Sequence, residues 1–345
     1  MKADEAYKGY LVDKAQLTEV HLALGCVKCH GGNDTATDKE AAHKGFNRRP
    51  SDNIKLCGEC HGTIAENYKT SLHYSTHGFE MGVSPRFSTS EKKVFAEKVF
   101  PKSCNNCHAS CGDCHVRGPV IGGVSTGLIA GHKFVRRAEA KTCGACHGGR
   151  VYPEFTGESG GPPDVHYQAG KNCMDCHGLI EMHGDGKSYN SRHEVPGRPS
   201  CTGCHETSSA KSQPAHDQHR DRLTCTACHS AAPYSNCYDC HLGKGAHAKP
   251  GMILGKDWRT GKVTTLRVVP TVRDTFASAG IKQENFDSRP NYWGASPHNI
   301  KKRTERTRSC ETCHQVRKDY LEKQNLIPEG SKMNENLIIN IKKEN

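Results

Sequence analysis

The 345-residue chain has few of the residues that build an ordinary hydrophobic core. Only 34% of its residues are hydrophobic and 6% aromatic, with 2 tryptophans, against 35 glycines and 16 prolines. A chain of this length normally forms about two or three domains around apolar cores. This composition by itself leans towards disorder. Compact folding therefore requires an apolar component that the polypeptide does not supply.

Long hydrophobic runs are also missing. A membrane-spanning helix needs about 18 or more consecutive apolar residues, and the sequence contains no such stretch. The first twenty residues lack the continuous apolar centre of a secretory signal peptide. We therefore expect no transmembrane segment, and no targeting signal is visible.

Cysteine is abundant: the chain has 20, and each belongs to a Cys-x-x-Cys pair followed directly by histidine. The ten pairs, numbered in chain order, are Cys26 and Cys29, Cys57 and Cys60, Cys104 and Cys107, Cys111 and Cys114, Cys143 and Cys146, Cys173 and Cys176, Cys201 and Cys204, Cys225 and Cys228, Cys237 and Cys240, and Cys310 and Cys313. The histidines that follow them are His30, His61, His108, His115, His147, His177, His205, His229, His241 and His314. This motif is the signature of covalent haem attachment, in which both thiols bond to the porphyrin and the histidine binds iron from one face.

Three other interpretations of paired cysteines explain the pattern less well. A zinc site takes four ligands and would consume two pairs, without requiring a histidine after each second cysteine. The iron–sulfur run Cys-x-x-Cys-x-x-Cys-x-x-x-Cys-Pro is absent. A disulfide framework suits an even number of cysteines but leaves the histidines unexplained. The motifs therefore predict ten covalently bound copies of haem c.

Haem supplies what the composition lacks. One large apolar disc for about every 34 residues can serve as the core. We therefore expect a multihaem cytochrome c fold that is mostly irregular, with short α-helices, little β-structure and a haem stack as the core. The net charge of +11 would otherwise suggest nucleic acid or an acidic membrane. Because each haem carries two propionates, we interpret the basic excess as their compensation and predict no nucleic-acid partner.

Twelve of the 22 histidines lie outside the motifs, close to the number of second axial ligands that ten irons require. Ligation by two histidines gives low-spin iron of low potential. The ten that we predict as second ligands are His21, His43, His73, His77, His132, His166, His183, His193, His219 and His298. His216 and His247 are left out, although His216 and His219 are three residues apart and suit two different haems. The spare histidines do not exclude one haem with another ligand or an open face.

The spacing of the motifs, from 7 to 73 residues, excludes a regular repeat. We divide the chain into a haem-rich body of nine sites (1–247), a haem-free segment that contains both tryptophans (248–297), and the tenth site with a C-terminal tail (298–345). Expected elements are helices near 4–20 and 315–325 and a strand within 264–272. Glycines 31, 62, 148 and 178 are expected to close helices at four motifs. The tail residues 336–342 are predicted as a strand that packs on its own body or adds to a neighbouring subunit.

Over residues 21–314 the chain resembles the multihaem cytochromes c. It matches decahaem periplasmic conduit cytochromes in haem number, but its motifs are less evenly spaced. The segments HKFVRRAEAKTCGACHGG, DVHYQAGKNCMDCHG and SPHNIKKRTERTRSCETCH look more like the octahaem tetrathionate reductase and hydroxylamine oxidoreductase-like group. The composition and the predicted tail strand also resemble extracellular cytochrome filament subunits. The octahaem group implies an enzyme, and the filament subunits imply a polymer.

We expect electron transfer through ten closely spaced haems, each with two histidine ligands, in extracellular or periplasmic respiration. Implied partners are other cytochromes, a quinol-oxidising membrane complex or a terminal acceptor, and the chain itself as an oligomer or filament. Because c-type haem is attached outside the cytoplasm, we expect an exported protein, periplasmic or at the cell exterior. The alternative is a reductase of small nitrogen or sulfur oxyanions at one open haem, with charges from Lys133, Arg136, Arg137 and Arg150. A third interpretation is a structural assembly protein whose haems serve only as rigid filler. Ten covalently bound irons argue against it. No catalytic residue is predicted.

Overall fold

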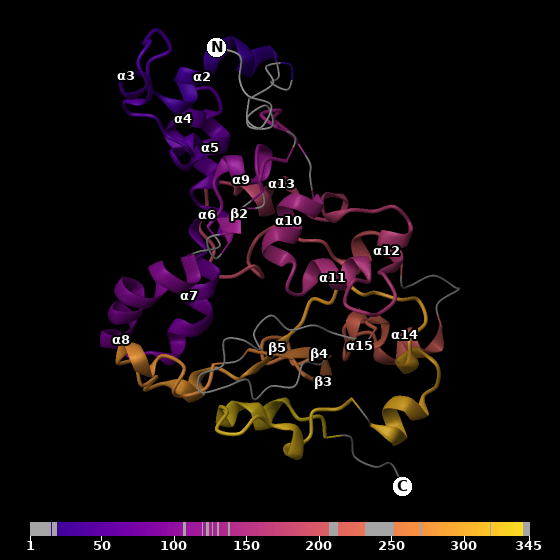
Figure 1. Cartoon of the computed structure of the whole chain (residues 1–345). Coiled ribbons are helices and arrows are strands. Elements are labelled where there is room, and N and C mark those ends of the chain that lie inside the picture. The colour runs from indigo at the N-terminus through magenta and orange to yellow at the C-terminus, as the bar shows by residue number, and fades with distance from the viewer. Residues whose placement is uncertain are drawn as a thin grey trace. The chain divides into compact units, whose positions relative to one another are not determined.

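A computed structural model divides the chain into two compact units (Figure 1). Unit 1 comprises Met1–Thr76, Asn105–Cys146 and His177–Gly197, and unit 2 comprises His77–Cys104, His147–Cys176 and Arg198–Asn345. The structure describes residue 15 and residues 19–105, 108–118, 120–121, 124–125, 127–129, 131–136, 139–206, 213–231, 252–269, 271–317 and 319–340. Most of the helix expected near 4–20, together with Cys107, the ninth motif and His247, lies outside these residues. The predicted haem-free segment and the tenth motif both belong to unit 2.

Unit 1 consists of short helices joined by irregular segments. They are α2 (Glu19–His30), α3 (Lys39–His43), a 3-10 helix (Pro50–Asp52), α4 (Ile54–Gly58), α5 (Gly62–Tyr68), α6 (Leu72–Ser75), α9 (Cys111–His115), α10 (Glu139–His147, whose last residue is assigned to unit 2) and α13 (Leu179–His183). The antiparallel pair β1 (Val120–Ile121) and β2 (Val124–Ser125) completes it. Helices this short are not stable alone. Side-chain caps set where several of them begin, for example Asp38, which accepts from Glu40 N at 2.9 Å and Ala41 N at 3.0 Å.

Unit 2 contains the larger share of regular structure. Its helices are α7 (His77–Val83), α8 (Thr89–Val94), α11 (Val151–Thr156), α12 (Val165–Gln168), α14 (Pro214–His219) and α15 (Cys225–His229), with π-helices over Phe95–Cys104 and Thr312–Val316. Its 3-10 helices are Ser84–Arg86, Cys173–Asp175, Cys201–Gly203, Ala277–Ala279, Phe286–Ser288, Glu305–Thr307, Lys323–Asn325 and Lys332–Leu337. Within the described part of the chain, no helix is both long and apolar enough to cross a membrane.

A three-stranded antiparallel sheet forms the centre of unit 2 (Figure 1). It contains β3 (Ile253–Lys256), β4 (Val263–Val268) and β5 (Tyr292–Gly294), with β4 in the middle. The strand predicted within 264–272 is therefore confirmed as β4. Leu266 pairs with Ile253 on one side and Gly294 on the other and is fully buried, because Leu321 and Leu337 cover it. The predicted haem-free segment thus shares a hydrophobic core with residues that follow the tenth motif.

The two units differ sharply in hydrophobic core. Among the described residues, the buried hydrophobic side chains of unit 1 are Ala65, Tyr68 and Ala109. Unit 2 has three clusters, one around Leu266, one that joins Leu254 to Tyr320, and one that contains Phe87, Phe95 and Ile281. Polypeptide alone supplies a core to unit 2, but hardly any to unit 1.

Two C-terminal predictions are wrong. The stretch 315–325 is not one helix: the π-helix ends at Val316, and a separate 3-10 turn covers Lys323–Asn325. The tail is not a strand over its described residues, since a 3-10 helix occupies Lys332–Leu337. Leu337 and Ile339 are 1% and 7% exposed because they pack beside β3 and β4. The apolar tail residues that suggested a strand are therefore used within the chain's own core.

Glycine after a motif has two different roles. Helix α2 ends at His30, and Gly31 has a φ of 67°, in the left-handed region where other residues are strained. Helix α10 likewise ends directly before Gly148. These two predictions are confirmed. At the other two positions the prediction is wrong, because α5 begins at Gly62 and Gly178 caps the start of α13.

A buried carboxylate ties α8 to a distant segment of unit 2. Glu91, 6% exposed, accepts from the backbone N of Ser88 at 2.9 Å, Lys282 at 2.6 Å, Gln283 at 2.9 Å and Glu284 at 3.1 Å. Burial alone would raise the pKa of Glu91, but these donors outweigh it and hold the pKa below its usual value. Glu91 therefore stabilises the folded unit most when it is ionised.

Replacing Glu91→Gln is expected to lower the free energy of unfolding of unit 2 by about 2 kcal/mol near neutral pH, since charge-assisted hydrogen bonds are lost. The stabilisation is fully present above the unfolded-state pKa of about 4.3 and is lost as the pH falls through the lower folded-state pKa. Urea titrations at several pH values, followed by tryptophan fluorescence, measure both effects. The exposed glutamate of the next segment, changed as Glu97→Gln, is the control. Equal losses in both variants would contradict the prediction.

Candidate haem sites

The motifs within the described residues are built as helical turns. In a helix, residues i, i+3 and i+4 share one face, so both cysteines and the histidine of Cys-x-x-Cys-His point to the same side. Backbone bonds close such turns, from His61 N to Cys57 O at 2.9 Å and from His314 N to Cys310 O at 2.9 Å. None of the described cysteines is in a disulfide. Each described turn can therefore present two thiols and one imidazole to the same ligand.

Among the described residues, motif histidines lie opposite histidines from outside the motifs in at least six places. The ring centroids are 6.5 Å apart for His21 and His61, 6.1 Å for His30 and His132, 6.1 Å for His115 and His183, 6.0 Å for His166 and His205, 6.1 Å for His216 and His229, and 6.1 Å for His219 and His314. Each pair joins segments that are separated in the sequence, and each pair lies within one unit. The near-constant separation indicates a common geometric requirement.

That separation fits one metal ion between two imidazoles. A metal–nitrogen distance of about 2 Å on each side, plus half a ring at each end, places the ring centres about 6 Å apart. Rings in van der Waals contact would stack more closely, as His21 and Phe134 do at 3.8 Å. The residues present therefore fit a haem iron held from both faces, next to thiols that can bond to the porphyrin.

Hydrogen bonds to Nδ1 fix the orientation of many of these rings. Nδ1 lies 2.7 Å from Asn47 O in His30, 2.7 Å from Val135 O in His115, 3.0 Å from Lys301 O in His229 and 2.7 Å from Ala215 O in His219. A carbonyl accepts, so Nδ1 carries the proton and Nε2 is the nitrogen left for a metal. The sequence gives no sign of these contacts, because the acceptors are backbone atoms.

Burial keeps several of the non-motif histidines neutral. Burial first, and then the facing motif ring, lowers the pKa of His21, His132 and His183. The pKa of His73 is also lowered, by burial above all and further by His177. A metal ligand must be neutral imidazole, so these environments suit coordination.

Glu181 contacts two predicted ligands. Its carboxylate lies 3.0 Å from Nδ1 of His177, and its backbone carbonyl lies 3.0 Å from Nδ1 of His73. His73 and His177 therefore have their Nδ1 atoms directed at one residue, although they are 104 positions apart in the sequence. This supports the prediction that His73 serves as a second ligand in unit 1.

Three further predicted second ligands, His77, His193 and His298, contact residues two or three positions away in the sequence. Nδ1 lies 3.2 Å from the Glu80 carboxylate in His77 and 2.9 Å from Ser296 O in His298. For His193 the structure gives a contact from its backbone N to Ser191 Oγ at 3.2 Å. The Nδ1 contacts orient the rings of His77 and His298.

The histidines of the third and fifth motifs, His108 and His147, have defined local positions. Nδ1 of His108 lies 2.6 Å from Tyr74 O, so Nε2 is again the nitrogen left for a metal. His147 is the last residue of α10, directly after the second cysteine of its motif. Both positions agree with their predicted role at the attachment site.

His43 and His216 differ from the sequence prediction. His43 is exposed, its Nδ1 is 2.8 Å from Lys39 O, and no motif histidine faces it among the residues that the structure describes. His216, which the prediction left out, faces His229 as closely as the other pairs do. The signal that could have found it is its position three residues before His219 on α14, where two rings reach two neighbouring motifs.

Thiols of different motifs also approach each other. In unit 1 the Cys57 and Cys111 thiols hydrogen-bond, and this contact lowers the pKa of Cys57 and raises that of Cys111. In unit 2 the Cys201 and Cys225 thiols do the same. Weaker electrostatic interactions join Cys29 to Cys57 and Cys114 to Cys146 in unit 1, and Cys176 to Cys204 and Cys228 to Cys313 in unit 2. Motifs 1, 2, 4 and 5 thus adjoin in one series, and motifs 6, 7, 8 and 10 in another.

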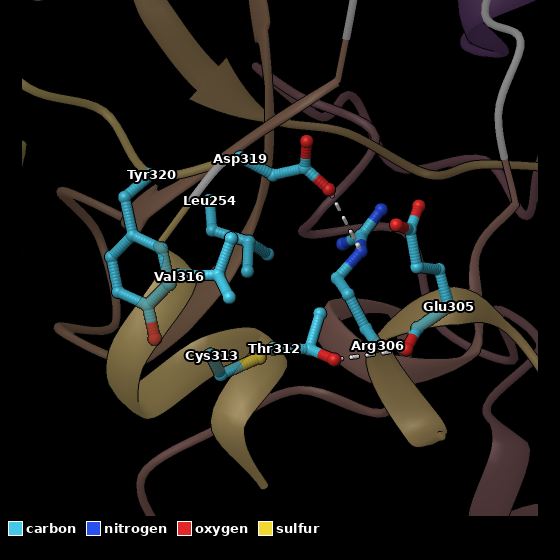
Figure 2. A pocket seen from close by; sticks show the side chains of 8 residues that line it. All are labelled: Leu254, Glu305, Arg306, Thr312, Cys313, Val316, Asp319 and Tyr320. Carbon is cyan, nitrogen blue, oxygen red and sulfur yellow. Dashed lines mark hydrogen bonds and ion pairs between the residues drawn. The ribbon is translucent and has the colours of Figure 1, made fainter. Parts of the chain in front are cut away.

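A pocket lies beside the tenth motif. Figure 2 shows Thr312, Cys313 and Val316, all from the π-helix, lining the pocket together with Leu254 and Tyr320, with Arg306 and Asp319 at its polar side. Arg306 lies 3.6 Å from Asp319 and donates to Ala227 O at 2.8 Å, which connects this pocket to α15 of the eighth motif. The pocket belongs to the tenth motif, because Cys313, the second cysteine of that motif, lines it.

Exposed apolar side chains gather next to the motifs. They are Val20, Leu22 and Leu24 before Cys26, Ile64 after His61, Leu179 and Ile180 after His177, and Val316 after His314. Leu179 is 68% exposed and Val316 is 64% exposed. Apolar surface in this position suits contact with a porphyrin face.

No family model, curated protein or solved structure matches this chain. The Cys-x-x-Cys-His motifs and the facing histidine pairs are therefore the features that point to haem at these sites.

Proposed function

We propose that this chain is a ten-haem electron carrier in which histidine binds each iron from both faces. Each haem, once attached, would take up and release one electron at its iron. The cysteines would tether the porphyrins, and the paired histidines would hold each iron from both sides, which would leave no position for a substrate. The observation that carries this proposal is the set of six imidazole pairs separated by 6.0–6.5 Å.

The adjoining motifs support conduction rather than storage. Thiols of motifs 2 and 4, and of motifs 7 and 8, approach each other, which would bring porphyrins attached there within short electron-transfer distance. Covalent attachment at two thiols and rigid ligation at both faces limit reorganisation when an electron moves. We infer export, because haem c is attached outside the cytoplasm, and redox proteins as partners: other cytochromes, a quinol-oxidising membrane complex or a terminal acceptor.

Low-temperature EPR of the oxidised protein tests this function. All ten haems are expected to be low-spin, and nitrite, sulfite or cyanide should leave the spectrum unchanged, because imidazole occupies both axial positions. Integration of high-spin against low-spin iron gives the result directly. If about one haem in ten were high-spin and responded to these anions, the chain would instead be a reductase fed by its other haems.

That reductase is the second candidate, but one of its expected anion-binding charges is engaged elsewhere. Arg150 is 8% exposed and lies 3.4 Å from the Glu154 carboxylate and 3.4 Å from Ser296 O, inside unit 2. Lys133 and Arg136 are exposed, and Arg137 lies outside the described residues. We do not propose a filament, since the apolar residues of the described tail pack in the chain's own core.

A further inference from the structure

The histidine that faces the seventh motif, His166, contacts a buried carboxylate. Nδ1 of His166 lies 2.8 Å from Oδ1 of Asp164, and this oxygen also accepts from the backbone N of His166 at 2.7 Å. The second oxygen, Oδ2, accepts from the backbone N of Ile300 at 2.7 Å. Asp164 is 2% exposed. The carboxylate is therefore held in place on both oxygens and shielded from water.

At the eighth motif, by contrast, the group that accepts from the histidine Nδ1 is neutral. His229 presents its Nδ1 to the neutral carbonyl of Lys301 at 3.0 Å. An anionic acceptor draws the Nδ1 proton more strongly than a carbonyl does, which leaves more negative charge on the ring and on any metal bound at Nε2. Such charge favours the oxidised iron over the reduced iron, and second-shell hydrogen bonding is one of the determinants of haem potential. A buried carboxylate has a larger effect than an exposed one because water screens it less.

The seventh and eighth sites are neighbours. The Cys201 thiol of the seventh motif hydrogen-bonds to the Cys225 thiol of the eighth. The eighth motif adjoins the tenth through Cys228 and Cys313, and Arg306 donates to Ala227 O between them. A difference in potential between the seventh and eighth sites would therefore act on a step between adjacent sites.

We propose that Asp164 is a positioning residue that lowers the reduction potential at the seventh motif below that at the eighth. This inference rests on the proposed function, since it requires haem at both motifs. One electron leaves the seventh site and enters the eighth, and no bond or proton changes place. Asp164 thereby biases electrons towards the eighth and tenth motifs and gives this part of the chain a direction.

Spectroelectrochemical titration of the ten-haem protein with Asp164→Asn tests the proposal. One of the ten one-electron components should move to higher potential, by about tenfold in the equilibrium constant for reduction, which is about 59 mV for one electron. The EPR signal of one low-spin haem should shift as well, because the electron density on its ligand changes. Asp164→Ser is the second variant, since serine can still cap α12 without carrying a charge.

Asp38→Asn is the matched control. Asp38 also caps a short helix through two backbone N–H groups, but no histidine Nδ1 is bound to it within the described part of the chain. Components that stay in place in Asp164→Asn and Asp164→Ser, with ten low-spin haems retained, would overturn the role of Asp164 and leave the proposed function standing. An equal shift in Asp38→Asn would also overturn it. A wild-type protein without covalent haem would overturn both proposals.

Discussion

Produced without haem attachment, the chain is expected to lose almost all amide protection in unit 1 while part of unit 2 stays protected. In unit 1, among the described residues, only Ala65, Tyr68 and Ala109 are buried hydrophobic side chains. Helices of four to twelve residues cannot persist without such a core. Unit 2 retains the sheet β3–β4–β5 with Leu266 and Leu337 packed on it.

Hydrogen exchange with mass spectrometry measures this difference peptide by peptide. The haem-free chain, made in a reducing cytoplasm, is compared with the exported protein. Peptides of unit 1 should exchange at the rate of an unfolded chain, and slow amides should be confined mainly to 253–340. Unit 1 peptides that remained as protected as in the exported protein would show that its core does not depend on haem.

Replacing His216→Ala is expected to convert one haem in ten from low-spin to high-spin. His216 faces His229 at 6.1 Å, so its removal would open one face of the iron proposed at the eighth motif. His219, on the same helix, faces His314 and should keep the tenth site unchanged. EPR and the visible high-spin band quantify the converted fraction. Added imidazole should restore the low-spin signal, which loss of folding would not allow.

His43→Ala provides the comparison. The sequence prediction included His43 among the ligands and left out His216. Because His43 faces no motif histidine within the described part of the chain, its removal should leave all ten haems low-spin. High-spin iron in His43→Ala together with an unchanged spectrum in His216→Ala would restore the original prediction and contradict the pairing described above.

The local chemistry of this protein can be read from the sequence. Each Cys-x-x-Cys-His motif contains its own attachment thiols and first histidine within five residues, and one helical turn is enough to bring them to the same face. The strand β4 was predicted correctly as well, because the run Val263–Val268 is rich in the β-branched residues that favour strands. The low hydrophobic content predicts a cofactor as part of the core, and the described residues of unit 1 contain few buried hydrophobic side chains, whereas unit 2 has polypeptide clusters.

Only the tertiary structure decided which histidine faces which motif. His30 and His132, or His115 and His183, are brought together by chain segments with no local pattern in common, so the number of spare histidines could be counted but not assigned. The same holds for Asp164, whose contact with Ile300 spans 136 positions. The prediction of a strand in the tail was wrong for a related reason. The residues around Leu337 and Ile339 have a local preference for a strand, but their burial against β3 and β4 outweighs it. Short motifs fix local geometry, whereas pairing across the chain depends on packing that no single segment contains.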